Sequence, residues 1–215
     1  MTGIPRSLVL VLALIGFMAA APVEGADHDP SALATRFQNN LLQVMKRAEI
    51  LGVSGRSREL RPVITDAFHL LLMVATSTGA PWRAATPDQR ARLLASYTRM
   101  SISTLASLFD DYSGETFQTV RQRQGSTRTV LVDTRILRPD DDAVNITYVT
   151  ARIKGRWWII DVILGGGISE VTVRRSEYNR LLRKAGIEGL IAALDHKSDQ
   201  LIADAKKDGE RPAQR

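Results

Sequence analysis

Three histidines, His28, His69 and His196, are the only imidazole groups in this 215-residue chain. They lie far apart, and none belongs to a His-Glu-x-x-His motif or stands beside a run of acidic residues. The chain contains no cysteine, which excludes disulfides, thiolate metal ligands and thiol catalysis. The sequence therefore predicts neither a zinc site nor a bound cofactor.

The motifs that serve acyl or phosphoryl transfer are also missing. No Gly-x-Ser-x-Gly sequence is present to expose a nucleophilic serine. The glycines at 165–167 are not followed by the Lys-Ser/Thr pair of a phosphate-binding loop, so they predict a tight turn. The acidic run Asp140 to Asp142 follows Pro139, which is the composition of a turn between strands rather than of a metal site.

One carboxylate, Asp161, stands within an apolar segment of Trp, Ile, Val and Leu residues. Burying a carboxylate without a partner is costly, so we expect an ion pair with Arg174 or Arg175. The alternative is an enzyme that acts on a hydrophobic substrate in a cone-like sheet pocket, with Asp161 or Tyr148 transferring a proton. Recovery of the substrate unchanged would contradict that alternative.

The first residues have the order of a secretory signal. Arg6 precedes the apolar run Ser7 to Ala21, which is shorter than the roughly 20 residues that a membrane-spanning helix needs. We expect cleavage before Ala26, with an uncleaved anchor as the alternative, and hence a periplasmic protein. Residues 26–207 suit a single domain, followed by a polar tail at 208–215. Removing residues 1–25 deletes one Arg and one Glu and keeps the formal charge of +6, which suits anionic membranes or acidic protein partners rather than nucleic acid once the chain is exported.

Helical patterns dominate the first half of the mature chain. Asp29-Pro30 predicts the start of a helix that Gly52 and Gly55 end. A second helical region covers 56–77, and its segment 68–75 is apolar on every side, which predicts burial on every side. The capping box at 86–89 predicts a long helix to about residue 111. A last helical region, 171–207, is interrupted near Gly186.

Between these helices, four segments are rich in β-branched and aromatic residues and are separated by short turns. They predict an antiparallel meander whose last strand is central or covered on both faces. The fold class is therefore α+β, with N-terminal helices, a four-stranded antiparallel sheet and C-terminal helices that enclose an apolar cleft. The predicted strands are 116–124, 127–137, 144–153 and 156–164.

Ten apolar and aromatic residues are candidates for lining the cleft, although a filled core uses the same side chains. They are Phe68, Leu71, Leu72, Trp82, Tyr97, Leu105, Phe109, Tyr148, Trp158 and Tyr178. Seven arginines are candidates for docking to a partner or for contact with a lipid headgroup, with a merely solvated surface as the alternative. They are Arg121, Arg123, Arg128, Arg174, Arg175, Arg180 and Arg183.

The order of several short motifs over residues 31–205 carries a resemblance to a known family. In sequence they are Leu60, Pro62 and Phe68, Gly79, Trp82, the segment 86–90 (TPDQR), the segment 112–117 (YSGETF), the segment 157–162 (WWIIDV), Ile168-Ser169 and the segment 175–178 (RSEY). This pattern resembles the MlaC-like periplasmic lipid-binding proteins, also called toluene-tolerance or auxiliary transport components, and among them the hopanoid-associated HpnM branch. His69 and Tyr178 depart from the Asp and Phe that are usual in the family, and the triple glycine is longer than expected.

The resemblance implies a monomeric, non-enzymatic carrier with lipid tails buried between helices and sheet. Such a protein shuttles a phospholipid or hopanoid between an inner-membrane transporter complex and an outer-membrane complex. A scaffold protein with a filled core and an exposed apolar patch is the remaining alternative, and it would hold no extractable ligand.

Overall fold

The structure is a computed structural model that describes residues 29–126, 128–139 and 141–210. The expected signal segment, residues 1–25, lies outside the described residues. Helix α6 reaches Glu210, so the first positions of the expected polar tail are helical and its last five residues also lie outside the described part.

The first helix starts at a side-chain cap, and the second follows it without one. Helix α1 (Pro30–Met45) is capped by Asp29, whose side chain accepts a hydrogen bond from the Ser31 amide at 3.1 Å, as the sequence predicts. The expected end at Gly52 is wrong, because α1 stops at Met45 and helix α2 (Ala48–Ala67) follows almost at once. Gly52 instead kinks α2, where its φ of 55° favours glycine.

Three helices lie between α2 and the first strand. In helix α3 (Leu70–Thr78), Leu71 is 49% exposed, so the expectation of burial on every side is wrong. Helix α4 (Ala80–Ala84) is a single short segment that leads to α5 (Pro87–Leu108). The predicted capping box is confirmed: the Gln89 amide donates to Thr86 Oγ1 at 3.1 Å, and the Thr86 amide donates to Gln89 Oε1 at 3.0 Å.

The sheet is an antiparallel meander with the order β1-β2-β3-β4-β5. Its strands are β1 (Thr116–Gln124), β2 (Thr129–Arg138), β3 (Asp141–Ile153), β4 (Arg156–Leu164) and β5 (Ile168–Ser169). The fold class is confirmed, with one more strand than predicted, since a two-residue strand has no sequence pattern of its own. Strand β4 is next to the edge rather than central, because only β5 pairs with it on the far side.

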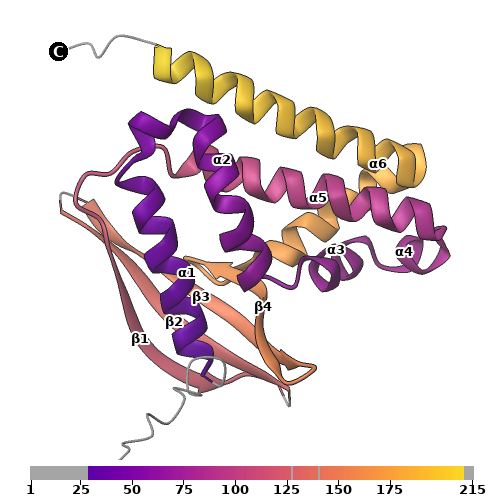
Figure 1. Ribbon diagram of the computed structural model, residues 1–215. Coiled ribbons are helices and arrows are strands. Elements are labelled where there is room, and N and C mark those ends of the chain that lie inside the picture. Colours follow the sequence, from indigo (N-terminus) through magenta and orange to yellow (C-terminus); the bar gives the residue numbers. More distant parts are fainter. Residues whose placement is uncertain (1–28, 127, 140, 211–215) are drawn as a thin grey trace, which may run out of the picture.

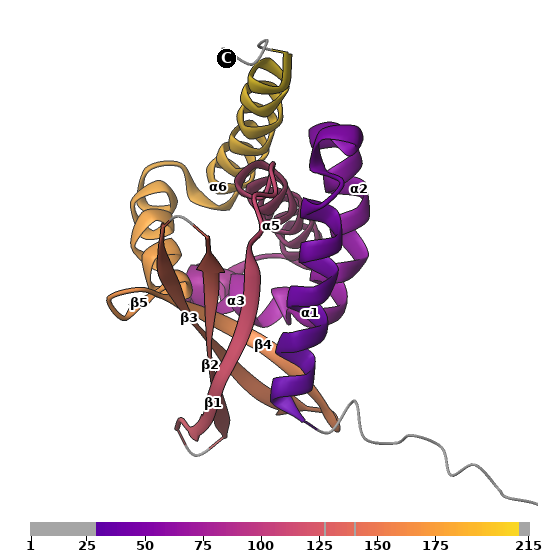
Figure 2. The ribbon, with the colours of Figure 1, turned by 90° about the vertical axis from the view of Figure 1, so that its left-hand side faces the viewer.

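All the helices gather on one face of the sheet, and the other face is turned outward (Figures 1 and 2). Strand β2 alternates accordingly, with Val132 and Thr134 buried and Arg135 exposed. Helix α6 (Glu170–Glu210) bends at Gly186, as predicted, where φ is 63°. Its first half rises from the sheet, and its second half runs back along α5 (Figure 1).

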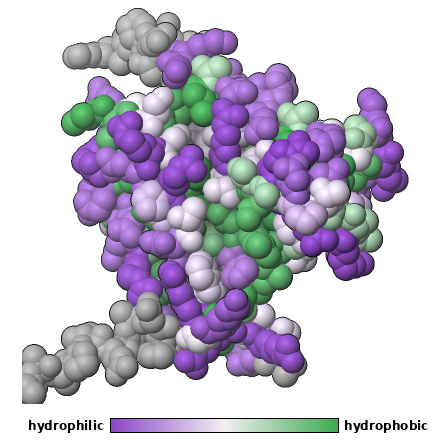
Figure 3. All heavy atoms as spheres, turned by 45° about the vertical axis from the view of Figure 1, so that its right-hand side comes forward, coloured by the Kyte–Doolittle hydropathy of each residue, from purple (hydrophilic) through white to green (hydrophobic). Residues whose placement is uncertain are grey.

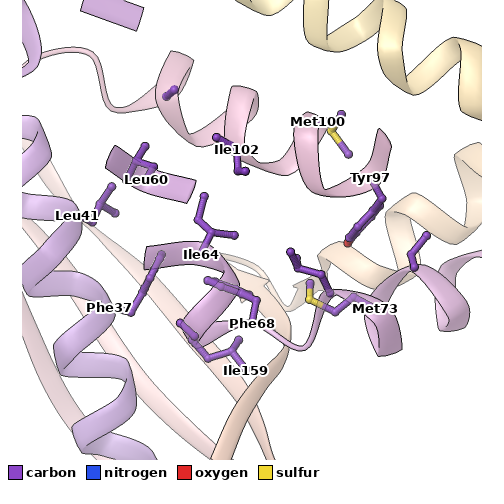
Figure 4. Close-up of a cluster of buried hydrophobic side chains, with 14 of the residues drawn as sticks. Phe37, Leu41, Leu60, Ile64, Phe68, Met73, Tyr97, Met100, Ile102 and Ile159 are labelled. Carbon is purple, nitrogen blue, oxygen red and sulfur yellow. The ribbon is translucent and has the colours of Figure 1, made fainter. Parts of the chain in front are cut away.

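Two buried polar side chains fix the helices to their neighbours. Gln38 of α1 donates to Thr134 Oγ1 at 3.0 Å and to the Tyr148 hydroxyl at 3.4 Å, which ties α1 to the sheet. Arg56 of α2 donates to the carbonyl oxygens of Ala106 and Ala48 at 2.8 and 3.0 Å. These bonds hold α1, α2 and α5 around the apolar interior that Figure 4 shows.

Candidate functional site

The interior between the helices and the sheet contains a cavity of about 320 Å³. Ligand pockets in proteins usually range from roughly 300 to 1,000 Å³. Every layer of the fold contributes to its wall, and most of the contributing side chains are apolar. They are Phe37, Leu41, Ile64, Phe68, Leu70, Met73, Tyr97, Met100, Ser101, Thr104, Leu105, Leu108, Phe109, Phe117, Ile146, Tyr148, Val162, Leu164, Glu170 and Arg174.

Aromatic rings form the deep wall. The Phe37 ring meets the Phe68 ring edge-on at 4.9 Å and the Tyr148 ring at 6.0 Å. Phe68 reaches this place because α2 ends there and the backbone becomes extended, pairing with Ile159 of β4. The next amide, that of His69, donates to the Ile159 carbonyl at 2.9 Å. In Figure 4, Tyr97 points from α5 toward Met73 of α3, on the opposite side of the interior from Phe37.

The wall reaches the surface at one end of the sheet. Leu108, at the end of α5, is 67% exposed, and Leu164, at the end of β4, is 40% exposed, although both line the cavity. Leu164 pairs with Ile168 of β5, which is also exposed. We therefore place the mouth between the end of α5 and the β4–β5 turn.

The hydroxyl groups of the wall are poor candidates for acid–base chemistry. Burial raises the pKa of both Tyr97 and Tyr148 to about 12, so each carries a neutral hydroxyl at neutral pH. Ser101 and Thr104 donate to carbonyl oxygens of their own helix, those of Tyr97 and Met100. Within the described residues, no three His, Asp or Glu side chains come together as metal ligands. Glu170 and Arg174, from the start of α6, are the charged lining residues among those described. The arrangement can hold a large apolar group with a polar end.

Comparison with known proteins identifies the family. The sequence model of the "MlaC protein" family matches residues 35–196, which is most of the chain. The chain belongs to the MlaC family. A similar solved structure is that of a phospholipid-binding protein from Ralstonia solanacearum, in complex with a phospholipid. Its TM-score is 0.72 at 17% identity, over 80% of this chain and 98% of the other, which shows a shared fold.

Two residues of the motifs that suggested the MlaC family, Asp161 and Ser169, form one hydrogen-bonded unit. Asp161 accepts from the Ser169 hydroxyl at 2.5 Å and from the Val171 amide at 3.0 Å, and Ser169 Oγ accepts from the Thr172 amide at 3.1 Å. The expected ion pair of Asp161 is therefore replaced by capping of the α6 N-terminus. Arg174 pairs instead with Glu170 and Glu177.

The structure brings five of the ten predicted lining residues to the cavity of this MlaC-family chain: Phe68, Tyr97, Leu105, Phe109 and Tyr148. Their contact with a ligand remains a prediction.

The other five lie elsewhere. Leu71 and Trp158 line a separate shallow depression, and Leu72, Trp82 and Tyr178 are outside the cavity lining. Tyr178 is buried behind the cavity wall, where burial and the neighbouring Tyr97 raise the pKa of its hydroxyl.

Figure 3 shows that hydrophobic side chains also reach the surface near the middle of one face, bordered by hydrophilic ones.

Several residues that line the cavity of this MlaC-family chain were not among the candidates named from the sequence. Two patterns in the sequence indicate some of them. Residues 97, 101, 104 and 108 recur at the spacing of one helical face. If Tyr97 lines the cavity, this spacing predicts that Ser101, Thr104 and Leu108 line it too. Alternation along a strand places Ile146 on the same face as Tyr148, and Val162 on the same face as Leu164. No comparable signal in the sequence indicates Glu170 or Arg174, which line the cavity because the capped start of α6 lies at its mouth.

Proposed function

We propose that this protein is a periplasmic lipid carrier without enzymatic activity. It takes a lipid from one membrane complex and delivers it to another, with the lipid tails in the cavity between helices and sheet and the headgroup at the mouth. The observation that carries the proposal is the largely apolar cavity, with exposed Leu108 and Leu164 at its opening, in a chain of the MlaC family.

The energetics support a protein-bound route for the lipid. Moving a lipid with about 30 methylenes into water costs on the order of 24 kcal/mol at ~0.8 kcal/mol for each methylene. A cavity that replaces the contacts of the bilayer offsets most of this cost. The direction of transfer then depends on the membrane complexes, an inner-membrane transporter and an outer-membrane acceptor or donor.

Location and ligand class belong to the same proposal. The signal-like residues 1–25 support export to the periplasm, and no helix in the described part of the chain is long and apolar enough to cross a bilayer. The phospholipid in the Ralstonia solanacearum structure supports a phospholipid as the ligand. The resemblance to the hopanoid-associated branch supports a hopanoid as the second ligand class.

A transfer assay tests this function. Donor vesicles with a fluorescent phospholipid are separated from acceptor vesicles by a membrane that passes protein but not vesicles, and the mature chain is added. We expect the label to reach the acceptor at a rate proportional to protein concentration, with the lipid chemically unchanged. A second series with a labelled hopanoid compares the two ligand classes. Transfer no faster than without protein in both series, or recovery of a modified lipid, would contradict the carrier function.

A further inference from the structure

The charged residues of the cavity wall come from one face of α6. Glu170 and Arg174 lie one turn apart, and both line a cavity whose wall is otherwise apolar or neutral. Their side chains are 34% and 26% exposed, so each is partly withdrawn from water. A charged pair at this place is adjacent to whatever polar end a bound lipid presents.

Arg174 is held loosely by its carboxylate neighbours. Its closest approaches are 3.8 Å to Glu170 and 3.4 Å to Glu177, whereas charge-assisted hydrogen bonds are roughly 2.7–2.9 Å long. Other arginines of this chain reach that range, with Arg92 at 2.8 Å from Asp88 and Arg121 at 2.9 Å from Asp133. The guanidinium of Arg174 therefore keeps the capacity to donate strong hydrogen bonds to a further anion.

A third residue on the same helical face adds an unmet hydrogen bond. Tyr178 follows Arg174 by one turn, and its buried hydroxyl has no hydrogen-bond partner among the described residues. Buried polar atoms in proteins are nearly always paired, so an orphaned hydroxyl needs an explanation. Tyr97, Arg174 and Glu170 are all near enough to affect its pKa. Because Tyr178 is outside the cavity lining, this hydroxyl is a buried neighbour of the charged pair and is not itself a contact of the headgroup.

From these observations we propose that Glu170 and Arg174 form a headgroup site that selects zwitterionic phospholipids, with Arg174 binding the phosphate and Glu170 the ammonium group. The proposal rests on the lipid-carrier function. In phosphatidylethanolamine, two methylene groups separate the phosphate oxygen from the nitrogen, so one headgroup can reach adjacent side chains of opposite charge. An anionic headgroup such as phosphoglycerol satisfies Arg174 but brings no positive charge to Glu170. A diacylglycerol satisfies neither residue.

Competitive loading tests the selectivity. The purified mature chain is incubated with vesicles that contain equal amounts of phosphatidylethanolamine, phosphatidylglycerol and diacylglycerol with identical acyl chains. The protein is then separated, and its lipids are measured by mass spectrometry. Because all three lipids share one vesicle surface, attraction of the cationic protein to the membrane does not bias the ratios. We expect the wild type to take up phosphatidylethanolamine about fivefold over phosphatidylglycerol, which corresponds to roughly 1 kcal/mol.

Three variants assign the effect to the two residues. Glu170→Gln should bring the ratio of the two phospholipids close to one. Arg174→Gln should lower both phospholipids about threefold or more relative to diacylglycerol. Arg175→Gln is the matched control. Arg175 is the next residue and has the same charge, and although the sequence made it a candidate for headgroup contact, the structure leaves it exposed outside the cavity lining. Thermal unfolding of each variant verifies that the fold is intact.

The outcomes separate the headgroup site from the carrier function. A wild-type ratio near one, or an equal loss of phospholipid in the Arg174 and Arg175 variants, would overturn the headgroup site while lipid is still bound. Absence of every lipid from the wild type would instead contradict the carrier function. Inorganic phosphate added at millimolar concentration should leave the loading unchanged. If it displaces phospholipid but not diacylglycerol, the site binds free phosphate and the proposal of a headgroup site is wrong.

Discussion

At the scale of single residues, two strand carboxylates each accept several hydrogen bonds, and these bonds determine what a substitution would cost. Asp161 of β4 holds Ser169 and the first turn of α6. Asp133 of β2 lies on the outward face of the sheet and accepts from Arg121, Arg123 and Thr147 at 2.9, 2.9 and 2.7 Å. The first aspartate positions the helix that carries Glu170 and Arg174, and the second stabilises the sheet.

Replacing Asp161 with Ala should lower the free energy of unfolding by about 1–2 kcal/mol, the usual cost of losing a helix cap. Breaking a buried ion pair would cost roughly 3–5 kcal/mol, because a charged partner would be left behind. Urea unfolding distinguishes the two ranges. Ser169→Ala is the matched variant, and the double variant should be less destabilised than the sum of the two singles, since both changes remove one shared bond. Additive effects would show that the two side chains act separately.

We expect the contribution of Asp133 to the free energy of unfolding to be lost in acid. Burial alone would raise the pKa of this carboxyl, but hydrogen bonds from Arg123, Thr147 and Arg121 lower it to about 2. Because this folded-state pKa lies below the unfolded value of about 3.9, the stabilisation is complete above about pH 4 and disappears as the pH falls through 2. Asp133→Asn should therefore lower stability by on the order of 1 kcal/mol at pH 6, with a difference that vanishes near pH 2. A difference that is constant from pH 6 to 2 would contradict this account.

At the scale of helices and strands, the features that depend on residues close together in the sequence were predicted correctly. The caps at Asp29 and Thr86 and the bend at Gly186 depend on contacts within a few positions along the chain. The four long strands were predicted from the local residue pattern and the short turns between them. The end of α1 and the orientation of α3 were predicted wrongly. Leu70 lines the cavity, whereas Leu71, turned by about 100° on the same helix, is half exposed. Both are leucines in an apolar run, so only the packing of α3 against α6, α5 and β4 separates their roles.

Leu105 of α5 lines the cavity, whereas Leu72 of α3 does not, so two matched tryptophan variants should give different results. Leu105→Trp places a large side chain in the cavity and should lower the amount of co-purified lipid at least threefold, because it takes up volume that a tail would fill. Leu72→Trp enlarges a leucine outside the cavity lining and should leave the lipid content unchanged. Lipid phosphate per mole of folded protein measures both variants. Equal effects of the two changes would show that the cavity does not hold the tails.

Truncation of leucines gives a related stability test. Leu93 is fully buried outside the cavity lining, so Leu93→Ala should cost about 2–5 kcal/mol through lost contacts and a new void. Leu105 already borders a void, so Leu105→Ala should cost the lipid-free protein clearly less. Chemical unfolding of both delipidated variants measures the difference. A Leu105 variant as unstable as the Leu93 variant would indicate a filled core at that position.

At the scale of the whole molecule, the described helices lie on one side of one sheet (Figure 1). The cavity lies between these helices and the sheet. The order of elements along the chain was sufficient to predict this α+β arrangement. It was not sufficient to predict the cavity, because a filled core and a lipid-lined cleft use the same apolar residues. The family motifs supplied that expectation, although the residues of those motifs, such as Asp161 and Ser169, mostly shape the elements around the cavity.

Native mass spectrometry of the purified mature chain tests the central claim most directly. The account predicts a species heavier than the polypeptide by the mass of a single membrane lipid, which denaturation releases intact, and a much weaker lipid-bound species for Leu105→Trp than for Leu72→Trp. A wild-type protein that carries only its polypeptide mass, both after purification and after incubation with phospholipid vesicles, would contradict the claim that the cavity holds a lipid.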